Sequence, residues 1–227
     1  MTTRISGATI LPLVLTVLLG TGCAAFRSDI GGAYGGDPVL NTGAGRVSVA
    51  FVFTHVRQTK GLDAIPKIDD AHRIIGGFDD FFADALPEIS NIGSYATFTV
   101  ESGDVNRPDR RAELAGLETA HDYVIRMRFS RGTSFARQTL ATIASTLTLT
   151  LAPAPYARHY TVAADVYGPG GVLIKRYERH AEVTNWVETF LILAYPFHPE
   201  GRKTEEVYVA FLHDVFREIE ADRILAP

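Results

Sequence analysis

Alternating apolar residues predict five β-strands along this chain. In each segment apolar side chains recur mainly at every second position, the period of a strand with a buried face. The alternation covers residues 47–53, 96–100, 123–129, 160–167 and 172–183. The last two segments flank the sequence Gly-Pro-Gly-Gly at residues 168–171, so they are expected to form a hairpin. Arg126 and Arg128 alternate with the apolar positions of the third strand, and we interpret them as a solvated sheet face rather than an anion site.

Three other segments carry apolar residues at helical spacing. Residues 74–85 follow Asp69 and Asp70, either of which can cap a helix. A short helix is expected at residues 112–120, and a longer one begins at Thr204. The resulting order is β-α-β-α-β-β-α. We therefore expect an α+β fold in which helices pack on one mixed sheet of about five strands, with two apolar inserts.

The two inserts are nearly uncharged runs at residues 138–157 and 186–199. Threonines and prolines in the first run argue against a single membrane-spanning helix. The sequence leaves three roles open for both runs: core, subunit interface or membrane contact. The candidate contact residues are Leu147, Leu149, Leu151, Trp186, Phe190, Leu191, Leu193 and Phe197.

The first 22 residues have the pattern of an export signal. Arg4 precedes an apolar run at residues 10–19, and small residues then lead to Cys23. The sequence Leu-Gly-Thr-Gly-Cys at residues 19–23 resembles the lipobox of bacterial lipoproteins, although the family usually has leucine where this chain has Gly20. In that family the signal is cut before the cysteine, which then receives lipid such as palmitate. The resemblance therefore implies a membrane anchor on Cys23.

The residue after the cysteine is Ala24 rather than aspartate. In Gram-negative lipoproteins this implies export to the outer membrane, with the domain in the periplasm. Glycines recur in the following segment without apolar periodicity, which predicts an unpacked tether. The expected organisation is a signal peptide at residues 1–22, a Gly-rich tether at residues 23–45 and a single α+β domain at residues 46–227.

Composition narrows the range of partners. The net charge is −4, so a nucleic-acid partner is not expected. Cys23 is the single cysteine among 227 residues, which excludes an intramolecular disulfide and a cysteine-ligated zinc site. The expected partners are the membrane, through the lipid, and either another envelope protein or further copies of the chain.

Catalytic motifs are not recognisable in the sequence. The seven histidines are scattered, without a pair at helical ligand spacing. We interpret His72, close to Asp69 and Asp70, as part of a helix cap. We interpret His180, close to Glu182, as part of an exposed strand face. The sequence therefore predicts no catalytic residue, metal or cofactor, and no enzyme activity, with an unrecognised envelope enzyme as the weakest alternative.

The order of elements resembles the periplasmic domain of the curli-secretion-channel lipoproteins and the N-terminal domain of TolB-like proteins. A closer resemblance is to a group of uncharacterised proteobacterial envelope lipoproteins. It lies in the Leu/Thr-rich run at residues 147–153 and in Thr184-Asn185-Trp186, which precedes the apolar residues 190–197. That group brings no known activity. We expect a binding or assembly module of the cell envelope, and the alternative is a self-assembling ring or secretion-channel component.

Overall fold

The computed structural model describes residues 22–37, 39–41, 43–60, 65–70, 75–147, 154–188 and 199–226. Its strands are β1 (Gly22–Arg27), β2 (Val47–Lys60), β3 (Pro66–Asp70), β4 (Ile92–Val100), β5 (Tyr123–Ser134), β6 (Ala154–Tyr167) and β7 (Leu173–Glu188). Its α-helices are α2 (Phe78–Ala85), α3 (Pro108–Ala120), α4 (Phe135–Leu147) and α5 (Glu200–Asp222). Short 3-10 turns occur at Leu86–Glu88, Asp104–Asn106 and Pro169–Gly171.

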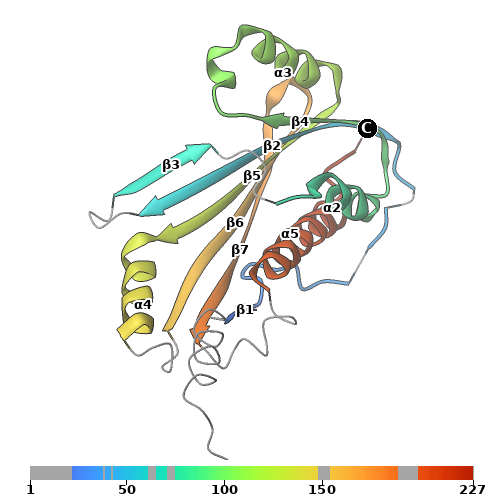
Figure 1. Ribbon diagram of the computed structural model, residues 1–227. Helices are drawn as coiled ribbons and strands as arrows, with labels where there is room; N and C mark the ends of the chain where they lie inside the picture. The colour runs from blue at the N-terminus through green and yellow to red at the C-terminus, as the bar shows by residue number, and fades with distance from the viewer. Residues whose placement is uncertain are drawn as a thin grey trace, which may run out of the picture.

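All the described strands belong to one mixed sheet. Its order is β1-β7-β6-β5-β2-β3, and β4 also pairs with β2. β2 runs parallel to β4 and β5, whereas the other pairs are antiparallel. Figure 1 shows the twisted sheet with α2 and α5 on one side of it. The predicted α+β class is confirmed, with seven strands in the described sheet instead of about five.

α2 and α5 pack on one face of the sheet and form the main core with it. Phe216 of α5 is fully buried, and its ring centroid lies 5.7 Å from that of Phe51 and 6.0 Å from that of Phe82. This core forms because every second residue of the central strands meets the apolar stripe of α5. The buried stripe consists of Val207, Phe211, Leu212, Val215, Phe216 and Ile219.

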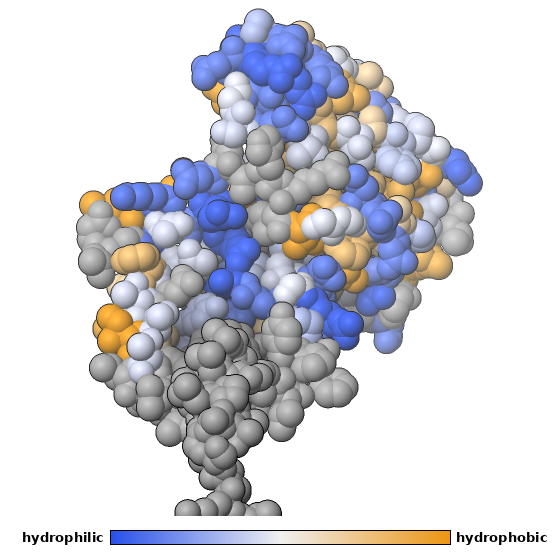
Figure 2. Space-filling view, in the orientation of Figure 1, coloured by the Kyte–Doolittle hydropathy of each residue, from blue (hydrophilic) through white to orange (hydrophobic). Residues whose placement is uncertain are grey.

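The opposite face of the sheet is covered at its two ends. At one end α3 packs Leu114 and Leu117 against a small cluster that includes Val52 and Phe98. At the other end α4 follows β5 directly and contacts β6. Between the two helices Arg126 and Arg128 are exposed, as the alternation of β5 predicted. Figure 2 shows hydrophilic side chains over the strands between α3 and α4.

The sheet continues beyond the first predicted strand. β2 extends to Lys60 and pairs with β3, so residues 54–60 and 66–70 are strands that the alternation did not predict. Asp69 and Asp70 lie in β3 and do not cap a helix, because α2 begins at Phe78. Gly77 precedes that helix with a φ of 73°, a conformation that favours glycine. The polar composition of β3 gives no strand pattern in the sequence. Its pairing with β2 identifies it as a strand.

The described parts of the two apolar inserts belong to regular elements. Leu147 is the last residue of helix α4. Trp186 belongs to β7, which continues to Glu188. α5 begins at Glu200, so Thr204 lies inside the helix, where its hydroxyl donates a hydrogen bond to the Glu200 carbonyl at 3.0 Å. None of the helices in the described ranges is long and apolar enough to cross a membrane.

Candidate functional site

Cys23, the predicted lipid attachment site, lies in the edge strand β1. β1 pairs antiparallel with the end of β7, which places Cys23 opposite Val187 and Ala24 opposite Trp186. Ala24 and Ala25 are both 0% exposed. The segment predicted as an unpacked tether therefore starts as a strand of the sheet. Its small side chains gave no alternation signal, and β7 supplies the backbone partners that make it a strand.

The chain beyond β1 is also fastened to the domain. The Ser28 amide donates to the Glu182 carbonyl at 2.8 Å, and Gly31 and His180 exchange backbone hydrogen bonds of 2.8 and 3.1 Å. A Cβ atom at Gly31 would overlap the His180 ring, so a larger residue there would have to displace that side chain. The Asn41 amide donates to a carboxylate oxygen of Glu220 on α5. The glycines thus permit tight packing here, which corrects the expectation of a free tether.

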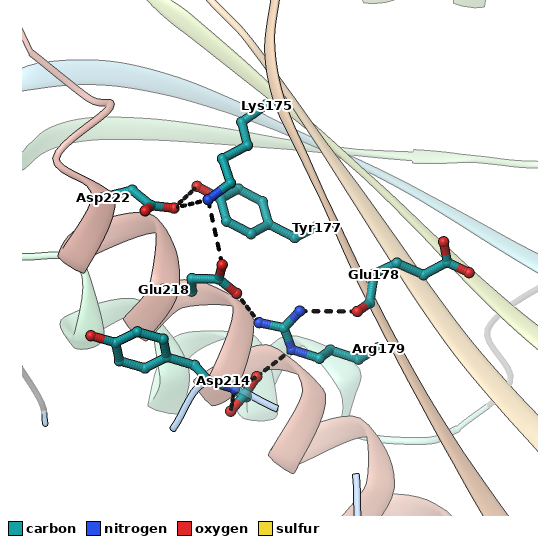
Figure 3. A network of polar contacts seen from close by, with 8 residues as sticks. Lys175, Tyr177, Glu178, Arg179, Asp214, Glu218 and Asp222 are labelled. Carbon is teal, nitrogen blue, oxygen red and sulfur yellow. Dashed lines mark hydrogen bonds and ion pairs between the residues drawn. The ribbon is translucent and has the colours of Figure 1, made fainter. Parts of the chain in front are cut away.

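A buried arginine joins this N-terminal segment to β7 and α5. The Arg179 side chain on β7 is 4% exposed and forms ion pairs with Asp214 and Glu218 of α5. Asp214 also accepts hydrogen bonds from the Tyr34 amide at 3.0 and 3.1 Å. Figure 3 shows the guanidinium between the two carboxylates. One cation therefore connects three parts of the chain.

The same network continues along α5 to Asp222. Its carboxylate accepts hydrogen bonds from Lys175 at 2.6 Å and from the Tyr177 hydroxyl at 2.7 Å (Figure 3). Burial would raise the pKa of Asp222, but the hydrogen bonds from Lys175 and Tyr177 outweigh it and lower that pKa. Burial lowers the pKa of Arg179, but hydrogen bonds and charge interactions with Asp214 and Glu218 raise it by more. The pKa of Arg179 is therefore raised overall. The network therefore stabilises the charged forms of both groups.

The face of the sheet that α3 partly covers carries two open hollows. One is about 710 Å³ and is lined by residues including Glu118, His121 and Tyr167. The other is about 520 Å³, and Arg126 lines both. Arg126 is neutralised by Glu118 at 2.6 Å and lies over the Tyr167 ring. These hollows lie open at the surface, and the residues that line them do not form a converging set of catalytic groups.

The predicted contact residues divide into two groups. Trp186 is half-buried in β7 opposite Pro155 of β6, and Leu147 closes α4. The others lie outside the described residues, so their contacts stay predictions: Leu149, Leu151, Phe190, Leu191, Leu193 and Phe197. The described elements that flank these runs meet at the end of the sheet that holds β1 (Figure 1).

The histidine and acidic pairs considered from the sequence do not gather into one site. His180 packs against Gly31, and Glu182 lies 3.1 Å from His159 instead. Asp69 and Asp70 are in β3, and His72 lies outside the described residues. In the described ranges no group of three or more His, Cys, Asp or Glu side chains could hold a metal ion.

The Arg179 network was not predicted from the sequence, although the spacing of its residues contains a pattern that indicates it. Arg179 occupies an inward position of its strand, between Tyr177 and Ala181. Asp214, Glu218 and Asp222 recur four residues apart and therefore share one face of a helix. An inward arginine and an acidic helix stripe together indicate a buried ion pair, but the sequence does not show which helix faces which strand.

No family model and no curated protein matches this chain. The solved PelC dodecamer from Paraburkholderia phytofirmans aligns with a TM-score of 0.31 and 10% identity, over 87% of this chain and 97% of that chain. A variant PelC dodecamer from the same organism gives a TM-score of 0.30 and 10% identity, over 88% and 99% of the two chains. The relation to PelC is a distant structural similarity.

Proposed function

We propose that this chain is a lipoprotein of the bacterial envelope, anchored in the outer membrane through Cys23 with its domain in the periplasm. The lipobox-like sequence at residues 19–23 supports lipid attachment. The observation that carries the proposal further is the position of Cys23 in β1. Because Ala24 and Ala25 are buried immediately after it, the lipid would be joined to the sheet without a flexible linker. The sheet would then hold a fixed orientation at the membrane.

This orientation defines a membrane end and a far end of the domain. β6 has 14 residues, and at about 3.3 Å per residue it extends about 45 Å from the β1 end of the sheet. α3 and the β6–β7 turn lie at the far end (Figure 1). Val105, Val172 and Leu173 are 75%, 66% and 46% exposed there. A projecting end with exposed apolar side chains supports a binding or assembly module.

Metabolic labelling tests the anchor. A palmitate analogue should label the wild-type chain in outer-membrane fractions, whereas Cys23→Ser should abolish labelling and release the processed or precursor chain from that fraction. Ser28→Cys in the Cys23→Ser background is the matched control, because it restores a thiol away from the lipobox and should stay unlabelled. Equal labelling of wild type and Cys23→Ser contradicts lipid attachment at this residue.

Fluorescence quenching tests the orientation. One fluorophore is attached at Glu205, exposed near the start of α5, and in a second variant at Asp109, exposed in α3. A quencher in the lipid headgroups should affect the label at Glu205 strongly and the label at Asp109 weakly. Equal quenching at both positions contradicts a fixed orientation, since a freely moving domain would bring both labels to the membrane alike.

A self-assembling ring is the second candidate. α4 exposes Phe135, Leu140 and Ile143 at 52%, 66% and 49%, and β3 exposes Ile68 at 64%. A head-to-tail contact with another copy would cover such residues, and contacts of this type close rings. The mass of the lipidated chain in mild detergent tests this candidate. A closed number of copies that Leu140→Glu disrupts supports a ring, and a monomeric lipidated chain rejects it.

A further inference from the structure

A positively charged cluster lies at the N-terminal end of α5, where β5 and β6 reach the membrane end of the sheet. Arg131 of β5 lies 3.2 Å from the carboxylate of Glu200, the first residue of α5, and Arg158 of β6 contacts the same carboxylate. The side chains of Arg131, Arg158 and Glu200 are 20%, 13% and 30% exposed. Two guanidinium groups thus share one carboxylate, which leaves an excess of positive charge in a mostly buried place.

Three polar groups around this cluster lack hydrogen-bond partners. The Asn185 side chain is 0% exposed, and neither its Nδ2 nor its Oδ1 atom has a partner. The Tyr208 hydroxyl also has none, although the residue is 1% exposed. The Nε atom of Arg158 is buried without an acceptor. Since buried polar groups are nearly always paired, their concentration in one place points to a ligand.

These groups face the same side of the sheet. Asn185 pairs with Tyr156 and Arg158 pairs with Val183, so Asn185 and Arg158 are diagonal neighbours on adjacent strands. On α5, Tyr208 lies with its ring 6.3 Å from the ring of Tyr160, which is aligned with Arg131 in the sheet. Burial raises the pKa of Tyr208, and the positive charge of Arg131 opposes that rise.

The start of α5 adds further attraction for an anion. The helix has 23 residues, and its N-cap Pro199 provides no side-chain cap for the first backbone N–H groups. Free N–H groups and the helix dipole favour negative charge at this position. Arg202 follows in the first turn, is exposed, and has no ion pair within the described segments. The carboxylate of Glu200 at this helix end is already shared by the two arginines.

We propose that Arg131, Arg158 and Asn185 bind a phosphate group at the N-terminal end of α5. Guanidinium forks match the geometry of phosphate oxygens, and an amide N–H adds a donor. The site adjoins β1: Asn185 is aligned with Ala25, and Arg27 donates to the Glu206 carbonyl at 3.1 Å. The phosphate therefore comes either from a lipid headgroup beside the anchor or from a free anion. Glu200 occupies the position of the ligand and competes with it.

Binding of inorganic phosphate to the mature chain carrying Cys23→Ser tests the site, by calorimetry at constant ionic strength. The unlipidated chain makes the result independent of the proposed anchor. Arg131→Gln should weaken binding about tenfold, since it removes a charge-assisted hydrogen bond. Glu200→Gln should strengthen binding about tenfold, because it removes the competing carboxylate. Arg176→Gln, on the opposite face of the sheet, is the matched control and should leave binding unchanged.

Flotation with vesicles distinguishes the two sources of phosphate. Zwitterionic phosphatidylcholine vesicles are compared with vesicles that also contain anionic phosphatidylglycerol. Tighter binding of Glu200→Gln than of the parent chain to the anionic vesicles supports a lipid headgroup. Tighter binding of this variant to inorganic phosphate alone supports a free anion. The proposal is overturned if Glu200→Gln, folded as judged by its circular dichroism, binds neither probe more tightly than the parent chain. A role of Glu200 as a structural ion-pair partner alone would give that result.

Discussion

Replacing Arg179 by methionine tests whether the buried network holds the N-terminal segment and α5 on the sheet. Methionine keeps an unbranched apolar stem but removes the guanidinium, so Asp214 and Glu218 lose the cation that they share. The Tyr34 amide would remain bonded to a carboxylate that has lost its ion pair. We therefore expect two effects: a lower free energy of unfolding for the domain and easier release of residues 28–37.

The expected loss follows from burial. Removing one partner of a buried ion pair generally costs about 3–5 kcal/mol. Asp214 and Glu218 keep 15% and 22% exposure, so water can partly solvate them, and we expect about 2–4 kcal/mol. Arg176→Met is the matched control on the same strand. Arg176 pairs with Asp165 at 2.5 Å but is 61% exposed, so its replacement should cost about 0–1 kcal/mol.

Urea denaturation of the mature chain with Cys23→Ser measures both variants, and amide hydrogen exchange measures the Tyr34 N–H. Arg179→Met should lower the urea midpoint and speed exchange at Tyr34, whereas Arg176→Met should change neither appreciably. Adding Asp214→Asn and Glu218→Gln to Arg179→Met should recover part of the loss, because neutral amides tolerate burial better than unpaired carboxylates. Equal losses in the two single variants would refute the role assigned to the buried arginine.

Three further predictions concern the N-terminal segment, the core and the acid limb of stability. Gly32 has a φ of 78°, and a Cβ there would lie 3.0 Å from a backbone oxygen, so Gly32→Ala should cost about 1–2 kcal/mol in thermal unfolding. Gly35→Ala is its control, since a Cβ there meets nothing within 4 Å, and equal losses would argue against the packed segment. Phe216→Ala should cost about 3–5 kcal/mol in urea denaturation, and a loss below about 1 kcal/mol would contradict its place in the core. The lowered pKa of Asp222 contributes stability above about pH 4 that is lost as the pH falls through the folded-state pKa, so Asp222→Asn should flatten the acid limb of a stability–pH curve, and an unchanged limb would contradict the contribution of its bond to Lys175.

Local periodicity was enough to predict the central part of the fold. The alternation in residues 123–129 and the turn at residues 168–171 identified β5 and the β6–β7 hairpin. The apolar stripe from Val207 to Ile219 identified the buried face of α5. These predictions succeeded because each element must bury its own apolar positions, whichever neighbour covers them. The lipobox-like sequence at Cys23 was equally local.

The strands β1 and β3 could not be predicted in this way. β1 contains small residues and β3 polar ones, and each is a strand because a longer neighbour offers it free backbone groups. The same holds for the glycines at residues 31 and 32, which look like a linker but allow close contact with β7. The composition of these segments predicts flexibility, but each is held in place by packing against a strand that is distant in the sequence.

The α+β class, the long C-terminal helix and the candidate anchor could be predicted from local patterns, since they depend on residues close together along the chain. Only the tertiary structure placed Arg179 against the acidic stripe of α5 and brought Arg131 and Arg158 together at Glu200. Such clusters depend on strand order and on the face that each helix covers. Strand order and helix placement minimise the free energy of the whole domain, so they cannot be read from the sequence of any single segment.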